Sequence, residues 1–169
     1  MVDADRIIRG VMKREGWPEY TDHLHDRGGP TKGGITLRTL ESWRRNRCRV
    51  EELQALTETE AIAIYRRRYV EMNGISQIDD YDLLEQTVDN AVLSGPFLAV
   101  RDLQRAVSVD DDGIIGPITL LAISACGADA ASIRLCKMRS LRLAGHVAKN
   151  PGQLVFLVGW LNRSLSFLP

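Results

Sequence analysis

The sequence predicts a mainly α-helical fold, and three observations lead to that prediction. Apolar residues recur at the three- and four-residue spacing of helices that bury one face. Residues that start and end helices bracket these runs, as in the capping pair Thr57 and Glu60. No segment has the convincing alternation of a half-buried strand, although Gly34-Ile35-Thr36 can contribute to a short hairpin.

The first expected helix covers residues 3–15. Asp3 is a suitable N-cap, and Gly16 with the following Trp17-Pro18 ends the run. The apolar stripe of this helix consists of Ile7, Ile8, Val11 and Met12. Glu15 lies in line with the stripe, so the segment predicts a carboxyl group at the C-terminal end of a buried helix face.

A loop rich in turn residues follows, from Gly16 to Gly34. A loop of this length inside a compact domain is uncommon unless it is functional. Further helices are expected at residues 36–43 with Thr36 as the cap, 58–72, 82–92, 96–107, 118–126, 129–148 and 153–165. Gly116-Pro117 begins one of them, and Pro151-Gly152 separates the last two.

Composition limits the classes of protein that fit. The 169 residues suit one compact domain, or one domain with a small appended unit. Lys plus Arg equals Asp plus Glu at 22 each, and this zero net charge argues against non-specific nucleic-acid binding, which needs a basic face. We therefore expect no nucleic-acid partner.

The cysteines and the chain termini bear on the cellular compartment. Cys48, Cys126 and Cys136 form no CxxC pair, so we expect reduced thiols. The first fifteen residues alternate charged and apolar residues, unlike a signal peptide. The most apolar stretch, Leu154 to Leu161, is too short to span a bilayer. We expect synthesis in a cytoplasm without a Sec signal, and no membrane span.

Glu15 is the first candidate for chemistry. A helix C-terminus carries partial negative charge and burial disfavours an ionised carboxylate, so both effects favour a protonated side chain. The general acid of a glycosidase needs such a proton near neutral pH. The alternative is a solvated glutamate at a frayed helix end, and helix geometry alone favours that alternative.

The loop after Glu15 supplies further polar candidates. They are Asp22, His23, His25, Asp26 and Thr31. A glycine-rich loop can place a second polar group opposite the glutamate across a cleft, as glycoside hydrolysis requires. The crowded histidines and aspartates also suggest a zinc site. We favour the glycosidase interpretation over a metal site because these ligands have no distant third anchor, and we expect no metal.

The stretch from Glu15 to Thr36, EGWPEYTDHLHDRGGPTKGGIT, resembles the opening signature of glycoside hydrolase family 108, roughly EGGYxNDPxDxGGxTxxGIT. The order of glutamate, tyrosine, acid, double glycine, threonine and Gly-Ile-Thr is retained. Two extra residues separate Glu15 from Tyr20, which lengthens the spacing to Asp26. The resemblance implies a lysozyme-like helical domain with a glycine-rich active-site loop.

The resemblance also implies roles for individual residues. Glu15 would be the general acid, Asp26 would steer the reaction or stabilise charge, and Thr31 would help to hold the attacking water. The residues expected to contact the sugar are Tyr20, Asp22, Thr36, Tyr65 and Tyr69. For Tyr65 and Tyr69, core packing with a bonded hydroxyl is the alternative.

Two further segments resemble the family. IYRRRY, Ile64 to Tyr69, is similar to its Tyr-x-x-x-Tyr-Trp helix, with Val70 in place of the tryptophan. TVDNAVLSGP, Thr87 to Pro96, is similar to a segment reading FDxAVNSGP, with Leu93 in place of asparagine. These substitutions suggest altered sugar contacts.

The C-terminal part resembles the small peptidoglycan-binding helical unit attached to this family. The resemblance rests on Leu-Gln, Asp-Gly-x-x-Gly-Pro and Thr in the segment Leu103 to Ile123, and on Gly-Trp-x-x-Arg around Trp160, which we expect to pack. We discount a calcium loop at Asp110 to Gly113, because Thr119 stands at the closing glutamate position. We expect a catalytic region at 1–95 and a peptidoglycan-binding-like region at 96–169, packed as one unit.

The combined hypothesis is an N-acetylmuramidase that needs no cofactor and acts as a monomer on bacterial peptidoglycan in the periplasm or cell wall. Its setting would be phage-type lysis, with release through a holin pore or by another non-Sec route, or wall remodelling for protein secretion. A non-catalytic peptidoglycan-binding module is an alternative. A lytic transglycosylase is another, although Gly16 stands where that class has serine after its glutamate.

Overall fold

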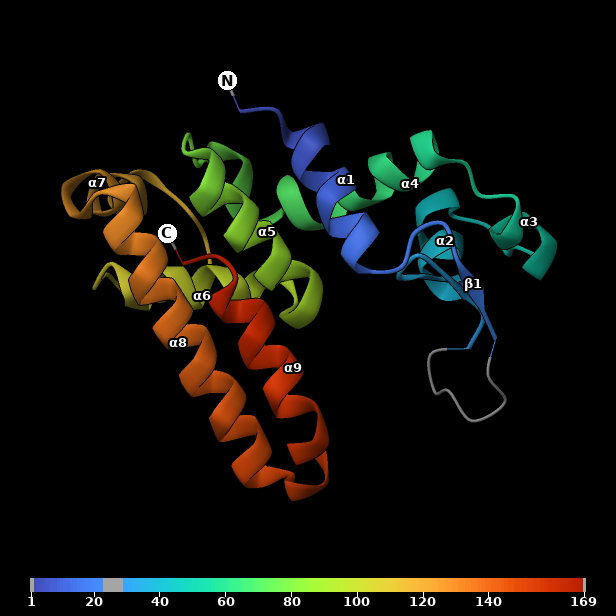
Figure 1. Ribbon diagram of the computed structural model, residues 1–169. Coiled ribbons are helices and arrows are strands. Elements are labelled where there is room, and N and C mark those ends of the chain that lie inside the picture. The colour runs from blue at the N-terminus through green and yellow to red at the C-terminus, as the bar shows by residue number, and fades with distance from the viewer. Residues whose placement is uncertain (1, 23–28, 169) are drawn as a thin grey trace. The chain divides into compact units, whose positions relative to one another are not determined.

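The computed structural model describes residues 2–22 and 29–168 (Figure 1). The chain forms two compact units, an N-terminal unit at Asp3–Arg68 and a C-terminal unit that begins at Tyr69. The expected division into regions 1–95 and 96–169, packed as one unit, stays a prediction. Both units are built mainly from helices, as the sequence predicts.

The N-terminal unit contains four α-helices and three short strands in the part of the chain that the structure describes. The helices are α1 (Ala4–Arg14), α2 (Leu37–Arg44), α3 (Val50–Gln54) and α4 (Glu58–Tyr65), and the strands are β1 (Tyr20–Thr21), β2 (Thr31–Lys32) and β3 (Ile35–Thr36). A π-helical turn, η1 (Arg66–Val70), continues α4 across the boundary between the units.

Side-chain caps fix the starts of these helices. The Asp3 carboxylate accepts a hydrogen bond from the Arg6 N–H at 3.1 Å, and Thr36 accepts one from the Thr39 N–H at 3.1 Å. Both caps are predicted by the sequence. The predicted apolar stripe of α1 is buried at all four positions, Ile7, Ile8, Val11 and Met12.

The small sheet is more than the sequence predicts. Its order is β1-β2-β3 and both pairings are antiparallel, with Thr21 opposite Thr31 and Lys32 opposite Ile35. Gly33 and Gly34 connect β2 to β3 with φ values of 51° and 77°, the left-handed conformation that a two-residue hairpin turn requires. Each strand has only two residues, too few for alternation to be visible in the sequence.

The helix predicted at residues 58–72 is divided. After α4 and the π-helical turn, the chain forms a 3-10 segment, η2 (Met72–Gln77). Asn73 and Gly74 have φ values of 57° and 77°, which end any regular helix, and asparagine and glycine tolerate this conformation best. In the C-terminal unit, the Asn73 side chain donates to the Gly113 carbonyl at 2.7 Å, so the break is held by a tertiary contact.

All regular secondary structure in the described part of the C-terminal unit is helical. It contains α5 (Tyr81–Ser94), α6 (Pro96–Ala106), α7 (Pro117–Cys126), α8 (Ala128–Lys149), a short 3-10 turn η3 (Pro151–Gln153) and α9 (Leu154–Leu165). These α-helices match the predicted ones to within a few residues. The long helix α8 packs against α5, α6 and α9, and α9 returns alongside it (Figure 1).

Hydrophobic side chains from α5, α6 and α8 form the core of this unit. Among them are Leu83, Val88, Val100, Leu103 and Leu135, all fully buried. Within the described residues, no single helix is long and apolar enough to cross a membrane. Helices α7 and α8 pass a test of length and composition only as a pair bent by 107°.

Candidate active site

Glu15 occupies the C-terminal cap of α1. Its backbone N–H donates to the carbonyls of Val11 at 3.0 Å and Met12 at 3.1 Å, so its position is fixed by the last turn of the helix. The side chain is half-buried. The predicted placement at the end of a buried helix face is thus observed.

The Gly33–Gly34 turn packs directly onto Glu15. A β-carbon added at Gly34 would lie 3.3 Å from the Cβ of Glu15 and 2.6 Å from the hydroxyl oxygen of Tyr65. The space at Gly34 is therefore filled by the two side chains already there. The double glycine has two functions here, because it forms the hairpin turn and allows the backbone to approach the glutamate.

Tyr65 holds the same turn from the other side. Its hydroxyl donates to the Gly33 carbonyl at 2.9 Å, and its side chain is 1% exposed. The core-packing alternative considered for Tyr65 therefore describes its geometry. The hydroxyl that would have served a sugar contact is bonded to the backbone of the turn.

Trp17 and Lys32 complete the support of the hairpin. A β-carbon at Gly33 would meet the Trp17 ring at 2.6 Å, so the ring lies against the turn. The Lys32 ammonium lies 5.3 Å from the centre of that ring and donates to the carbonyls of Gln54 at 2.5 Å and Leu56 at 2.9 Å. The sequence alone gave neither residue a role, and their only signal was their place within the loop from Gly16 to Gly34.

The remaining predicted residues of this unit lie along the sheet. Thr31 begins β2, and its hydroxyl donates to the Gly29 carbonyl at 2.9 Å. The Tyr20 hydroxyl donates to the Asp22 carboxylate at 3.3 Å. The pKa of Tyr20 is raised, first by burial and second by the negative charge of Asp22, so the phenol stays protonated. The hydroxyl of Thr36 caps α2.

Four of the candidate positions fall elsewhere. Asp26, with His23 and His25, lies outside the described residues. Tyr69 is half-buried in the π-helical turn and is the first residue of the C-terminal unit.

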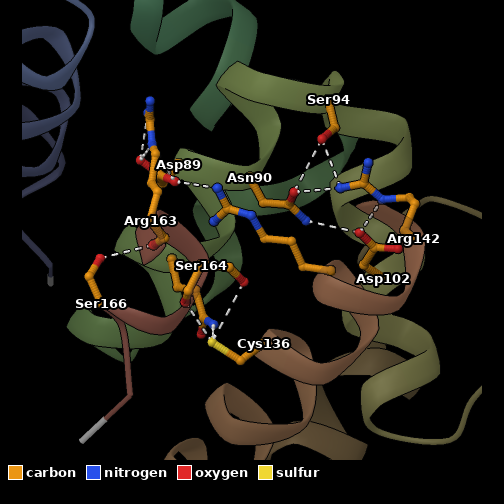
Figure 2. Close-up of polar contacts among 11 residues, drawn as sticks. Asp89, Asn90, Ser94, Asp102, Cys136, Arg142, Arg163, Ser164 and Ser166 are labelled. Atoms are coloured by element: carbon orange, nitrogen blue, oxygen red, sulfur yellow. Dashed lines mark hydrogen bonds and ion pairs between the residues drawn. The ribbon is translucent and has the colours of Figure 1, made fainter. Parts of the chain in front are cut away.

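The polar residues of the TVDNAVLSGP segment form a buried network in the C-terminal unit (Figure 2). Asp89 pairs with Arg163 of α9, at 2.8 Å, and with Arg139 of α8, at 2.9 Å. Asn90 donates to Asp102 at 3.1 Å and accepts from Arg142 at 2.8 Å. Asp89 and Asn90 are both fully buried, so they organise the packing of α5 against the other helices.

The predicted peptidoglycan-binding-like segment is organised by Gln104. Its side-chain amide donates to Asp112 at 2.7 Å and to Thr119 at 3.2 Å, and its oxygen accepts from the Gly113 N–H at 2.8 Å. The hydrogen bond from Gln104 holds the pKa of Asp112 below its usual value. Asp111 pairs with Arg101 at 2.8 Å. These two carboxylates thus make contacts within the C-terminal unit.

Comparison with known families identifies the chain. Residues 8–95 match the family described as Glycosyl hydrolase 108, and residues 98–165 match the one described as Predicted Peptidoglycan domain. The chain belongs to the glycosyl hydrolase 108 family. It is a glycoside hydrolase that acts on peptidoglycan, and its place of action is the cell wall.

A solved structure supports the same assignment. The structure of Brucella abortus SagA is 35% identical, with a TM-score of 0.75, and the match covers 97% of this chain and 94% of that one. A search of curated proteins gave no match. The similarity to this solved structure therefore extends over both units of the chain.

Proposed function

We propose that this glycosyl hydrolase 108 protein is an N-acetylmuramidase, which hydrolyses the β-1,4 bond from N-acetylmuramic acid to N-acetylglucosamine. The observation that carries the proposal is the packing of the Gly33–Gly34 turn onto Glu15. A half-buried carboxyl group at a helix C-terminus, with the backbone of a glycine turn packed against it, suits a general acid. Region 1–95 would perform catalysis and region 96–169 would hold the glycan strand.

Glu15 protonates the glycosidic oxygen as the bond from that oxygen to the anomeric carbon breaks. The bonding electron pair stays on the leaving oxygen, and a water molecule adds its hydroxyl to the anomeric carbon. The attacking water loses one proton to solvent and Glu15 takes one up again from solvent, so the net reaction consumes one water molecule. Thr31 donates its own proton to Gly29, so its oxygen lone pairs can accept a hydrogen bond from this water. Asp26 would stabilise the developing positive charge.

We propose that most of the sugar contacts come from the same hairpin. Tyr20, Asp22 and Thr36 lie in or beside the strands, and we propose that they contact the glycan together with Tyr69. Tyr65 is different, because its hydroxyl is bonded to Gly33. We propose that Tyr65 is a positioning residue that holds the turn against Glu15.

The decisive experiment is digestion of purified peptidoglycan, with the products reduced and identified by mass spectrometry. The wild type should release fragments that end in reducing N-acetylmuramic acid, and Glu15→Gln should release at least a thousandfold less. Glu19→Gln is the matched control, because Glu19 is an exposed glutamate four residues further along the same loop. It should retain activity within about twofold.

Other products would contradict specific parts of the proposal. Anhydro ends would show a lytic transglycosylase, and reducing N-acetylglucosamine ends would show cleavage of the other glycosidic bond. Binding to the wall without any soluble product would leave only the binding module. Equal loss of activity in Glu15→Gln and Glu19→Gln would remove the assignment of Glu15 as the acid.

For the biological setting we propose phage-type lysis, ahead of wall remodelling for protein secretion. Either role uses the same bond cleavage and differs in how the protein reaches the wall. A holin gene beside the coding sequence would support lysis with release through the holin pore. A neighbouring toxin gene would support secretion instead. We propose a monomer in both cases, which light scattering of the purified protein would test.

A further inference from the structure

The first turns of α9 carry a group of exposed apolar side chains. Leu154, Val155, Phe156 and Val158 are 60%, 78%, 53% and 68% exposed. Single exposed apolar side chains are ordinary on protein surfaces, whereas several together mark a surface that contacts another molecule. We call these four residues the apolar tip.

The apolar tip projects from the rest of the C-terminal unit. Successive residues of a helix point about 100° apart, so the four side chains face different sides of α9. A helix that lay flat against its unit would bury one of these sides, yet all four side chains are more than half exposed. Figure 1 shows the same arrangement, because the joined ends of α8 and α9 extend beyond α5 and α6. The connection from Ala148 to Gly152 is exposed as well.

One face of α8 is both apolar and basic. Ile133, Lys137 and Leu141 follow one another at four-residue intervals, so they lie on the same side of the helix. Ile133 is 50% exposed, Leu141 is 59% exposed, and Lys137 between them is exposed too. The α8–α9 hairpin therefore presents apolar side chains on both of its helices.

The chain from residue 130 onward is basic. All 22 acidic residues precede it, whereas six Lys and Arg residues lie within it. Three of these six pair with Asp89 or Asp102 inside the unit. The other three are exposed and form no ion pair with any residue that the structure describes; they are Arg134, Lys137 and Lys149. A negatively charged surface would complement the hairpin.

The combination of charge and apolar area distinguishes between occupants of this surface. A second copy of the chain would bring basic residues against basic residues. A glycan strand would leave its hydroxyl groups without partners against the aliphatic side chains of the apolar tip. An anionic lipid surface offers phosphate groups to the basic residues and an apolar layer directly beneath those groups.

We propose that the α8–α9 hairpin docks on the surface of an anionic lipid bilayer. The apolar tip enters the boundary between headgroups and acyl chains, and Lys149 beside it lies near lipid phosphates. The hairpin lies at the surface without spanning the bilayer. Helix α9 has 12 residues and is about 18 Å long, whereas the hydrocarbon core is about 30 Å thick. Docking holds the hydrolase beside the membrane that the cell wall surrounds.

Sedimentation of the full wild-type chain with lipid vesicles tests the proposal. One set of vesicles contains equal parts of phosphatidylglycerol and phosphatidylcholine, and the other contains phosphatidylcholine alone. We expect at least about tenfold tighter binding to the anionic vesicles, and weaker binding as salt is raised, because salt screens exposed charges. Equal binding to both sets would remove the anionic headgroup from the proposal, and absence of binding to either set would overturn it.

The double variant Val155→Ser/Val158→Ser tests the apolar tip. Serine and valine have similar helix propensities, so α9 should persist. We expect binding to anionic vesicles to weaken at least about tenfold, because less apolar area is buried in the lipid. The matched control is Ile118→Ser/Leu121→Ser on α7, whose side chains are 76% and 72% exposed outside the hairpin. The control should bind as the wild type does, and equal losses in both variants would overturn the location.

Lys149→Gln tests the charge beside the apolar tip. One basic residue at an anionic surface strengthens binding about fivefold, so we expect a loss of that size. Arg47→Gln is the control, because Arg47 is an exposed basic residue of the N-terminal unit and its loss lowers the net charge equally. Thermal melts of all these variants should match the wild type. Equal effects of Lys149→Gln and Arg47→Gln would assign the attraction to net charge and not to the hairpin.

Two further results separate this inference from its alternatives. Light scattering that shows a wild-type dimer, which Val155→Ser/Val158→Ser converts to a monomer, would assign the apolar tip to a second copy and overturn lipid docking. The vesicles contain no peptidoglycan, so their binding is independent of catalysis. Release of muramic-acid ends without vesicle binding would overturn only this inference, and vesicle binding without such release would overturn only the proposed muramidase.

Discussion

The two units use charge in opposite ways. In the N-terminal unit the ion pairs lie near the surface, as between Arg9 and Glu58, whose side chains are 57% and 54% exposed. In the C-terminal unit, Asp89 and Arg139 pair at 0% and 1% exposure. An exposed pair is worth about 0–1 kcal/mol, whereas removal of one partner from a buried pair costs about 3–5 kcal/mol.

The difference indicates what each unit depends on. In the C-terminal unit, a buried network of charged side chains joins the helices. Removal of one member leaves another buried charge without its partner, which lowers the free energy of unfolding. The N-terminal unit instead fixes Glu15 by backbone, through a glycine turn and the Tyr65 hydroxyl. The free energy of unfolding of this unit should therefore fall when a side chain is added at a closely packed glycine. It should change little when a surface charge is removed.

The largest expected effect comes from Asp89→Ala. This change leaves Arg139 and Arg163 without their shared carboxylate, and the charge of Arg139 is fully buried. We expect a loss of about 3–5 kcal/mol in the free energy of unfolding of the C-terminal unit. Urea denaturation followed by far-ultraviolet circular dichroism would measure it.

Glu58→Ala is the matched control in the other unit. It removes the carboxylate from an exposed pair with Arg9 and should cost no more than about 1 kcal/mol. If Asp89→Ala and Glu58→Ala lower the free energy of unfolding by the same amount, ion pairs contribute alike in both units. The proposed difference between the units would then be wrong.

Gly34→Ala should give the next largest effect, this time in the N-terminal unit. The left-handed conformation costs an alanine about 1–2 kcal/mol. The new methyl group also meets Tyr65 and Glu15, so the turn has to move away from the glutamate. We expect hydrolysis to fall at least about tenfold, which corresponds to about 1.4 kcal/mol of transition-state stabilisation.

Gly29→Ala separates the cost of the left-handed backbone conformation from the effect of a new contact with Glu15. Gly29 also has a positive φ, 65°, but an added β-carbon there meets nothing within 4 Å. It should show the conformational cost and keep its activity. Equal activity losses in the two variants would mean that the approach of Gly34 to Glu15 is not what matters.

The sequence predicted local features well and long-range partners poorly. The Asp3 and Thr36 caps, the α1 stripe and the division of the C-terminal helices follow from short-range patterns. The predicted Tyr65 sugar contact could not be decided, because the partner of its hydroxyl, Gly33, lies 32 residues earlier. Asp89 is a sharper case, since its partner Arg163 lies 74 residues away.

The site itself was predictable in part for the same reason. Glu15 is identified by its place on one helix face and by the glycines that follow it. That Gly34 rather than Gly33 contacts Glu15 depends on the hairpin turn, and strands of two residues leave no periodic signal. The buried charge network was hidden because Gln86, Thr87, Asp89 and Asn90 look like the solvated face of a helix, yet all four are fully buried.

The smallest effect concerns the helix caps, where the two units should behave alike. Thr57 caps α4 by accepting from the Glu60 N–H at 3.3 Å, and Asp80 caps α5 by accepting from the Leu83 N–H at 2.9 Å. Thr57→Ala and Asp80→Ala should each cost about 1 kcal/mol, because each leaves one N–H of the first turn without its partner. Urea denaturation would compare them. Similar costs would mean that the two units differ only in how their charged side chains contribute to stability. A cost several times larger for Asp80→Ala would mean that losing a helix cap near the buried network also destabilises the C-terminal unit more strongly.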